Sequence, residues 1–479
     1  MIDLLLAIRN LLRNRRRSMS TLMALALGLS AILLFSGFQA NLASTMLTAV
    51  VRGGGHVQIQ HRDYFTYGSA NPAEYAIANY GALVDEIRQD PVLRDLVLVA
   101  TPLLRFGGLA GNFDAGISRP VIGTGWVAED VDRMRKWNEF QVPNSRPDFP
   151  LVGRSPDAAI VGLGVARVLQ LCEALKVDNC QQAPNTRGVL ESSAGKPGPK
   201  AVAADLPADI AALAATEVAS TAAAAKAGGG ARIELLSGSS RGTPNVAQLQ
   251  VVAAEDQVFK ELDEISVIVH LAQAQRLVFG KQPPKANAII VVLKRTADLG
   301  TAAKRLEAIA AKGGSARAPL VSRDFGELNP FYKQSEMMFD FIFGFILVLI
   351  GGIVLFTVSN TMHTAVVERT VEIGTLRAIG LRRGGIRKLF IVEGFLLGWV
   401  GAALGVLLAV GIGELVNRSG VTWLPPGSSE RLPLQLRVLN SPWMVLGYAV
   451  LLVAIASLSA WWPAWRAAKL KIVDALRHA

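Results

Sequence analysis

Residues 341–380 read FIFGFILVLIGGIVLFTVSNTMHTAVVERTVEIGTLRAIG and carry the strongest structural signal in the chain. The part from Phe341 to Val367 contains no Asp, Glu, Lys or Arg. It exceeds the about 20 apolar residues that a helix needs to cross a bilayer. A charged segment follows at once and begins with Glu368. This succession predicts a membrane-spanning helix that ends at a membrane surface.

Three other apolar runs have the same character. They cover Ser18–Val51, which has no charge, Phe390–Val416, which contains only Glu393 and Glu414, and Trp443–Trp462. A secretory signal has an apolar region of only about 7–15 residues before a small-residue cleavage site. The first run is longer, so we expect it to stay in the chain. The expected transmembrane helices are residues 19–46, 338–366, 389–416 and 443–464.

The overall composition agrees with a membrane protein. The chain has 479 residues, of which 51% are hydrophobic and 18% charged, and its mean hydropathy is +0.35. Ordinary soluble domains have about 25% charged residues. This composition excludes a disordered chain and disfavours a wholly soluble enzyme.

The positive charge is concentrated beside the apolar runs. Residues 1–18 carry a net charge of +4, residues 368–389 carry +4 and residues 466–479 carry +3, which together account for the whole net charge of +11. Short loops rich in Lys and Arg stay in the cytoplasm. We therefore expect both termini (1–18 and 465–479) and the loop 367–388 inside. Residues 47–337 and 417–442 are expected outside. No basic patch remains for a nucleic acid, and the basic segments suit anionic lipids.

The outer segment 47–337 is long enough for a domain with its own core. Alternating or continuous apolar runs predict strands, and an amphipathic helix is expected at 297–312 with Leu299, Ala303, Leu306 and Ile309 on one face. This pattern indicates an α+β domain of the split βαβ kind. The strands are expected at 56–60, 96–104, 120–126, 247–255, 265–270 and 286–294.

One stretch of the outer segment breaks this pattern. Residues 201–227 hold 14 alanines in 27 positions, so they bury little apolar surface. We interpret residues 183–232 as an insertion, most simply a linker, although it offers a surface to a substrate or partner.

Cys172 and Cys180 lie eight residues apart in the outer segment. In an oxidising compartment they either close a small disulfide loop or remain two buried thiols. The chain has no P-loop, no H-E-x-x-H and no G-x-S-x-G motif. His56 and His61 fall on opposite faces of a strand, which does not suit a shared metal. We therefore expect no catalytic site, no metal and no cofactor in this chain.

The third apolar run contains features that a lipid-facing helix does not need. Glu393 sits about one turn inside its cytoplasmic end, and a carboxylate in a membrane helix is a functional candidate. We expect a structural or coupling role, with Arg387 or Lys388 as its partner. Close helix packing, within a bundle or across a dimer, is expected at Gly394, Gly398, Gly401 and Gly405.

The charged segment after the second run has a helical pattern of its own. Glu368, Glu372 and Leu376 are spaced four apart, and Gly380 follows as a stop signal. A short helix at the inner membrane face is therefore expected. It either caps the bundle or acts as a lever for a cytoplasmic partner.

The segment ERTVEIGTLRAIGLRRGGI (368–386) resembles the signature of the MacB/FtsX-like ABC transporter permeases. AIRNLLRNRRRS (7–18) resembles their amphipathic entry helix, and IVEGFLLGWVGAALG (391–405) resembles their third span. PAWRAAKLKIVDALR (463–477) is similar to their tail, although Ile472 replaces the usual proline. The resemblance covers about 40% of the chain, while the Ala-rich insertion is atypical of the family.

The resemblance implies a permease subunit in a bacterial inner membrane, with residues 47–337 in the periplasm. Such permeases pair as homodimers or heterodimers with two copies of a separate cytoplasmic ATPase, which holds ATP and Mg. A coupling helix enters a groove on that ATPase. The residues of this chain that match it are Glu368, Arg369, Glu372, Gly374, Arg377 and Gly380.

The resemblance also bears on the substrate. GGGHVQIQHRDYF (53–65) looks like the string that follows the first span in lipoprotein-releasing (Lol-type) members. This favours extraction or export of a lipoprotein or lipid-like substrate. One alternative is a MacB-like efflux permease with a periplasmic adaptor. Another is FtsX-like signalling to a periplasmic hydrolase.

Overall fold

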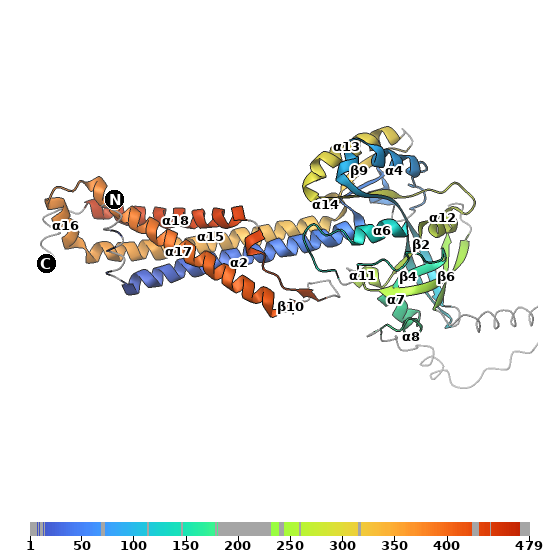
Figure 1. Cartoon of the computed structure of the whole chain (residues 1–479), viewed down its shortest axis with the longest axis horizontal. Helices are drawn as coiled ribbons and strands as arrows, with labels where there is room; N and C mark the ends of the chain where they lie inside the picture. Colours follow the sequence, from blue (N-terminus) through green and yellow to red (C-terminus); the bar gives the residue numbers. More distant parts are fainter. Residues whose placement is uncertain are drawn as a thin grey trace, which may run out of the picture. The chain divides into compact units, whose positions relative to one another are not determined.

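The computed structural model describes residues 7, 9, 13, 15–68, 72–112, 115–144, 147–177, 180, 231–238, 244–257, 260–314, 318–423, 431–440 and 442–469. The chain divides into two compact units. The helical unit draws on residues 1–46, 331–423 and 431–479, and the second unit on residues 47–330. We describe each unit separately (Figure 1).

Four long helices build the helical unit. They are α2 (Arg15–Gly54), α15 (Pro330–Glu368), α17 (Arg383–Ser419) and α18 (Pro442–Lys469), and all four are long and apolar enough to cross a membrane. Shorter elements complete the unit: α16 (Thr370–Ala378), β10 (Thr422–Trp423), β11 (Leu432–Pro433) and η2 (Val438–Asn440).

Each predicted span lies inside one of these helices. The helices are longer than the apolar runs, because polar turns continue the same backbone hydrogen bonding outside an apolar layer. The predicted limits at residues 47 and 337 therefore fall within α2 and α15. Most of the predicted entry helix 1–18, residues 424–430 of the outer loop and residues 470–479 of the tail lie outside the described residues.

The predicted small-residue stripe of α17 meets two helices of the same chain. Gly394 and Gly398 face Ala460 and Ala456 of α18, whereas Gly401 and Gly405 face Leu25 and Leu29 of α2. A Cβ at Gly401 would lie 2.6 Å from the Cβ of Leu25, closer than two carbon atoms approach. The absence of side chains lets α17 pack closely between α2 and α18. The contacts that the structure contains are thus contacts within one chain.

Leucine at position 401 is expected to destabilise the helical unit by about 1–3 kcal/mol, because the added atoms overfill a packed interface. The matched control is Gly411→Leu in the same helix, where a Cβ meets no atom within 4 Å. The measurement is the thermal unfolding of the full chain in detergent, followed by circular dichroism. Equal unfolding temperatures for the two variants would contradict the packing described here.

Nine strands make up the described sheet of the second unit. They are β1 (Val57–His61), β2 (Val97–Asn112), β3 (Ile117–Trp126), β4 (Ala158–Gly162), β5 (Arg232–Gly238), β6 (Pro244–Glu255), β7 (Ser266–His270), β8 (Ala288–Leu293) and β9 (Leu320–Asp324). Their order is β3-β7-β4-β6-β5-β2-β8-β1-β9, and β3 also pairs with β2.

The long strand β2 belongs to two parts of this sheet. Residues 104–112 pair with β3 and residues 109–111 with β5, which closes a ring of six strands, β2-β3-β7-β4-β6-β5. Residues 97–103 pair with β8 and start a four-stranded sheet with β1 and β9. All six residues of β8 are buried, as expected for a central strand covered on both faces.

Helices cover each part of the sheet. The ring is packed by α7 (Leu163–Val168) and α12 (Leu271–Phe279). The four-stranded sheet is packed by α4 (Tyr80–Gln89) and α13 (Leu299–Gly313). The other short helices are α3 (Tyr64–Tyr67), α5 (Leu93–Leu96), α6 (Ala128–Arg135), α8 (Cys172–Leu175), α11 (Lys260–Asp263), η1 (Thr296–Asp298) and α14 (Phe325–Leu328).

The strand predictions locate six of the nine strands, and β4, β5 and β9 were not predicted. The predicted helix 297–312 corresponds to η1 and α13. Its buried side chains are Ala302, Leu306, Ile309 and Ala310. Leu299 packs against the same core, so Ala303 is the one residue of the expected face that lies beside the buried stripe. The unit is an α+β domain, with a closed ring of strands that the expected split βαβ plan does not contain.

Cys172 and Cys180 form a disulfide, with their Cα atoms 5.5 Å apart. Of the two alternatives left by the sequence, the structure contains the bonded one. Cys172 is a buried residue of α8, and Cys180 packs against the core of the ring. The predicted insertion 183–232 lies outside the described residues up to residue 230, and Arg232 is the first residue of β5.

Candidate functional site

The charged segment after α15 forms a short separate helix at one end of the bundle (Figure 1). We predicted a helix beginning at Glu368, but Glu368 is the last residue of α15. Arg369 leaves the helical conformation, with φ −108°, and α16 begins at Thr370. The break lets α16 take its own direction while staying tied to a long helix.

Gly380 ends α16 as predicted. Its φ is +107°, a conformation that favours glycine. The N–H of Gly380 donates to the carbonyl of Arg377 at 3.1 Å, and the N–H of Leu381 donates to the carbonyl of Leu376 at 3.0 Å. This pair of bonds is the Schellman motif, which satisfies the last carbonyls of a helix.

One face of α16 packs on the bundle and the rest is exposed. Ile373 and Gly374 are buried, and Ile373 joins the core that includes Ile386 and Phe390 of α17. The other faces combine charge with exposed apolar side chains, and Ile379 is 80% exposed. A helix with this composition offers a surface to another molecule.

Two ion pairs join this region to the start of α2. Arg17 binds Glu368 through two hydrogen bonds of 2.8 and 2.7 Å, and Arg13 lies 2.7 Å from Glu372. The two arginines are four residues apart, and so are the two glutamates. All four side chains are partly exposed, so each pair contributes at most about 1 kcal/mol. The Arg17–Glu368 pair joins α2 to the end of α15, and the Arg13–Glu372 pair joins α16 to the residues just before α2.

A third ion pair is buried inside the bundle. Nη1 of Arg369 donates to Oε1 of Glu393 at 2.9 Å, and the side chains are only 9% and 3% exposed. Burial of two charges is tolerated only when they pair well. Arg369 was predicted to face a partner and is instead inside the bundle. Arg387 and Lys388, the expected partners of Glu393, are replaced by Arg369, because the turn after Glu368 directs that side chain inward.

The second oxygen of Glu393 is also buried. Oε2 makes no hydrogen bond within the described part of the chain. Glu393 also lines a cavity of about 20 Å³, together with Arg17, Ser18, Thr361 and Arg369. A space of this size accommodates one water molecule among polar groups. The pair therefore occupies a small polar pocket within an otherwise apolar bundle.

The predicted site residues fall into separate groups. Glu368, Arg369, Glu372 and Glu393 take part in the three ion pairs above, which with Arg13 and Arg17 we call the ionic cluster. Gly374 lies on the buried face of α16, and Gly380 ends this helix. Arg377 lies in the last turn of α16 and joins none of the three ion pairs described above. The glycines of α17 serve helix packing, and the cysteines belong to the second unit. Sequence reasoning missed Arg13 and Arg17 as partners, although their spacing of four matches that of Glu368 and Glu372.

Comparison with known families identifies the family to which this part of the chain is similar. Residues 341–472 match the FtsX-like permease C-terminal family. The chain carries an FtsX-like permease domain. The matched residues contain most of α15 and all of α16, α17 and α18. Together with α2, the chain has four helices long and apolar enough to cross a bilayer, as fits a membrane protein.

Several proteins are similar to this chain. An uncharacterised ABC transporter permease of Methanocaldococcus jannaschii is 26% identical over 48% of this chain and 55% of its own length. The macrolide export ATP-binding/permease protein MacB of Psychrobacter cryohalolentis is 37% identical over 27% and 17%, respectively. The lipoprotein-releasing transmembrane protein LolC of Haemophilus influenzae is 29% identical over 31% and 36%. These matches span 55% or less of each relative's own length.

Proposed function

We propose that this chain is the permease subunit of an ABC transporter. It couples ATP hydrolysis by a separate cytoplasmic ATPase to motion of the second unit on the other side of the membrane. The observation that carries this proposal is α16, a short and largely exposed helix tied to its neighbours by ion pairs. Glu372 of α16 binds Arg13 just before α2, and Arg369 at the N-cap of α16 binds Glu393 of α17. A displacement of α16 would therefore move α15 and α17, the two long helices that precede and follow it in the chain.

The proposed orientation puts α16 in the cytoplasm with both termini, and the second unit in the periplasm of a bacterial inner membrane. The basic segments support it through the preference of short Lys- and Arg-rich loops for the cytoplasm. The end of α18 has the composition of a membrane interface, since Arg466 lies over the ring of Trp462 at 4.0 Å and Lys469 over Trp465 at 3.5 Å. Tryptophan and basic residues are typical of the membrane interface.

The proposed assembly contains two ATPase copies and a second permease, either this chain again or a paralogue. ATP and Mg belong to the ATPase, because the sequence lacks a P-loop. Within this assembly, we propose that Glu372 and Arg377 of α16, with Ile379 directly after it, face the ATPase. The buried Arg369 acts by holding α16 to α17.

The proposed substrate is a lipoprotein or lipid-like molecule. The match to LolC and the string at 53–65 support this choice. The matches to MacB favour a second candidate, an efflux permease with a periplasmic adaptor. FtsX-like signalling to a periplasmic hydrolase is a third.

Purification of the tagged full chain in mild detergent, with mass spectrometry of its partners, tests the proposal. We expect a P-loop ATPase in near-equal amount. A lipoprotein beside it would support the first candidate, an adaptor the second and a hydrolase the third. Repeated recovery of the chain without an ATPase, also after mild cross-linking in cells, would overturn the transporter assignment.

Reversal of charge at Arg377 is expected to uncouple the ATPase. Arg377→Glu should weaken ATPase binding about tenfold, because it reverses a charge on the proposed contact face. Stimulation of ATP hydrolysis should fall accordingly while the chain still inserts in the membrane. Arg418→Glu, which changes an exposed arginine at the far end of α17, is the control. Glu372→Lys should act like Arg377→Glu, and normal stimulation in both would show that α16 is not the contact.

A further inference from the structure

The second unit contains a cavity of about 320 Å³ that the proposed function does not use. It is lined by three arginines and by the first residues of β2, Val97–Ala100. Each arginine comes from a different helix: Arg88 from α4, Arg94 from α5 and Arg133 from α6. The volume is within the range of small-molecule sites. The whole cavity lies within one unit of the chain.

The cavity adjoins an open edge of the sheet. Residues 97–103 of β2 pair with β8 on one side, and β3 begins to pair only at Leu104. No described strand covers the other side of residues 97–103. Nη2 of Arg88 donates to the carbonyl of Ala100 at 2.8 Å, which fixes this guanidinium over the strand.

A buried carboxylate positions two of the arginines. Asp130 is 4% exposed. One of its oxygens accepts from Arg133, and the other accepts from Nη2 of Arg88 at 3.4 Å. Two guanidinium groups thus lie on either side of one carboxylate. This arrangement fixes both guanidiniums before any ligand arrives, which lowers the cost of binding.

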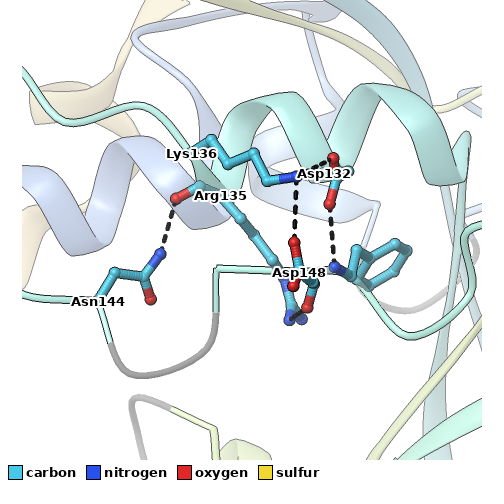
Figure 2. Close-up of polar contacts among 6 residues, drawn as sticks. Asp132, Arg135, Lys136, Asn144 and Asp148 are labelled. Atoms are coloured by element: carbon cyan, nitrogen blue, oxygen red, sulfur yellow. Dashed lines mark hydrogen bonds and ion pairs between the residues drawn. The ribbon is translucent and has the colours of Figure 1, made fainter.

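The helix that carries Asp130 and Arg133 is itself anchored at its other end (Figure 2). Nζ of Lys136 binds Asp132 at 2.8 Å and Asp148 at 3.2 Å. The N–H of Phe149 donates to Asp132 at 3.1 Å, and Asn144 donates to the carbonyl of Arg135 at 3.0 Å. These bonds tie α6 to the following loop, so Arg133 is presented by a rigid support.

The charges of the cavity are not balanced. Three guanidinium groups face Asp130 and Asp95, and Asp95 lies 3.8 Å from Arg94 with both side chains largely exposed. Within the described part of the chain, Nε and Nη1 of Arg88 make no hydrogen bond. Positive charge and unused donors therefore remain in the cavity.

We propose that this cavity binds a phosphate group. Arginine forks match phosphate oxygens in pairs. A carboxylate has two oxygens, fewer than three guanidinium groups can engage, whereas a phosphate offers more acceptors and more charge. The group belongs either to a free phosphate compound or to the headgroup of a phospholipid. The proposal does not depend on the transporter assignment, since binding requires neither ATP nor a partner.

Titration calorimetry on the full chain in dodecyl maltoside, without phosphate in the buffer, tests this site. The probes are inorganic phosphate and dihexanoylphosphatidylglycerol below its micelle concentration. Arg94→Gln is the decisive variant, because it leaves the Asp130 pairs intact. We expect it to weaken binding about tenfold, and Arg88→Gln to weaken binding further. Arg295→Gln, an exposed arginine paired with Asp298 at 3.0 Å and outside the cavity, should bind like the unchanged chain.

The outcomes separate the two sources of phosphate. Binding of inorganic phosphate assigns the site to a free phosphate compound, and binding of the short-chain lipid alone assigns it to a headgroup. Either result supports the proposal if the Arg94→Gln variant binds the same probe more weakly. No heat of binding from either probe at millimolar concentration overturns it. Equal affinity in Arg94→Gln and Arg295→Gln overturns it as well.

Discussion

Replacing Glu393 by alanine is expected to destabilise the helical unit by about 3–5 kcal/mol, because it leaves the Arg369 guanidinium buried without its counter-charge. The pair is joined at 2.9 Å and almost fully buried. Arg369→Ala should cost a similar amount, since the Glu393 carboxylate then stays unpaired. The measurement is thermal or denaturant unfolding of the full chain in detergent.

The double variant makes this test specific. Arg369→Met with Glu393→Leu replaces both charges by apolar side chains of similar volume, and such replacements of buried pairs are often neutral or stabilising. We therefore expect the double variant to recover most of the stability that each alanine variant loses. Reversal at the exposed pair, Arg13→Glu with Glu372→Arg, is a control with an expected effect within about 1 kcal/mol. Single variants as stable as the unchanged chain would refute the buried pair.

The same variants separate stability from coupling. If the Arg369–Glu393 pair transmits motion between α16 and α17, the stable double variant should still lose part of the ATPase stimulation. Full stimulation in that variant would assign the pair a purely structural role. Either result is interpretable, because the stability of the variant is measured independently.

The stability of the second unit is expected to fall by about 3 kcal/mol as the pH drops from 6.5 to 4, because His56 is buried in its neutral form. Burial lowers the pKa of His56 from 6.5 to about 4. The unfolded chain therefore takes up this proton at a higher pH than the folded chain. The neutral His56 therefore contributes its full stabilisation above pH 6.5, and this contribution is lost as the pH falls toward 4.

The contacts of His56 explain why the neutral ring is preferred. Its Nδ1 accepts from the N–H of Leu293 at 3.1 Å, and its Nε2 lies 3.2 Å from Oγ1 of Thr296. Trp137 packs edge-on against the ring, with centroids 5.0 Å apart. Protonation of Nδ1 would place its N–H directly against the N–H of Leu293, so two donors would face each other. None of these contacts supplies a negative charge for the protonated ring.

Hydrogen exchange of the β1 and β8 amides in the full chain measures this pH dependence. His56→Gln should be less stable near neutral pH and should lose most of the slope between pH 6.5 and 4. His61→Gln, at the other end of β1, is the control and should keep the slope. An unchanged slope in His56→Gln would show that other groups carry the pH dependence.

Much of the helical unit follows from local features of the sequence. The four apolar runs are long enough for a bilayer, and Gly380 ends α16 because its positive φ favours glycine. The limits of α2 and α15 were not predictable from hydropathy, since a helix continues through polar turns wherever its backbone bonds can. In the second unit, β9 was missed because it has few apolar residues and its partner β1 lies far away in the sequence. The strand β5 was missed because its start adjoins the Ala-rich stretch, although it pairs with the nearby β6.

The ionic cluster shows the same division. The sequence marked Glu393 as unusual, because a carboxylate within a membrane helix is a functional candidate. It marked Glu368 and Glu372 by their spacing of four and by the family motif. It did not identify Arg369 as the partner of Glu393, since a single turn at Arg369 changes which way that side chain points. The arginine cavity was not visible at all, because Arg88, Arg94 and Arg133 show no common spacing.

By itself, the sequence determined the number of membrane helices, the expected orientation and the position of the short helix after α15. These depend on length, hydropathy and charge, which are local properties of the chain. Only the tertiary structure decided which charges pair, which helices the glycines of α17 touch and where three arginines meet. Such contacts join residues tens to hundreds of positions apart, and their energies depend on burial that local sequence does not specify.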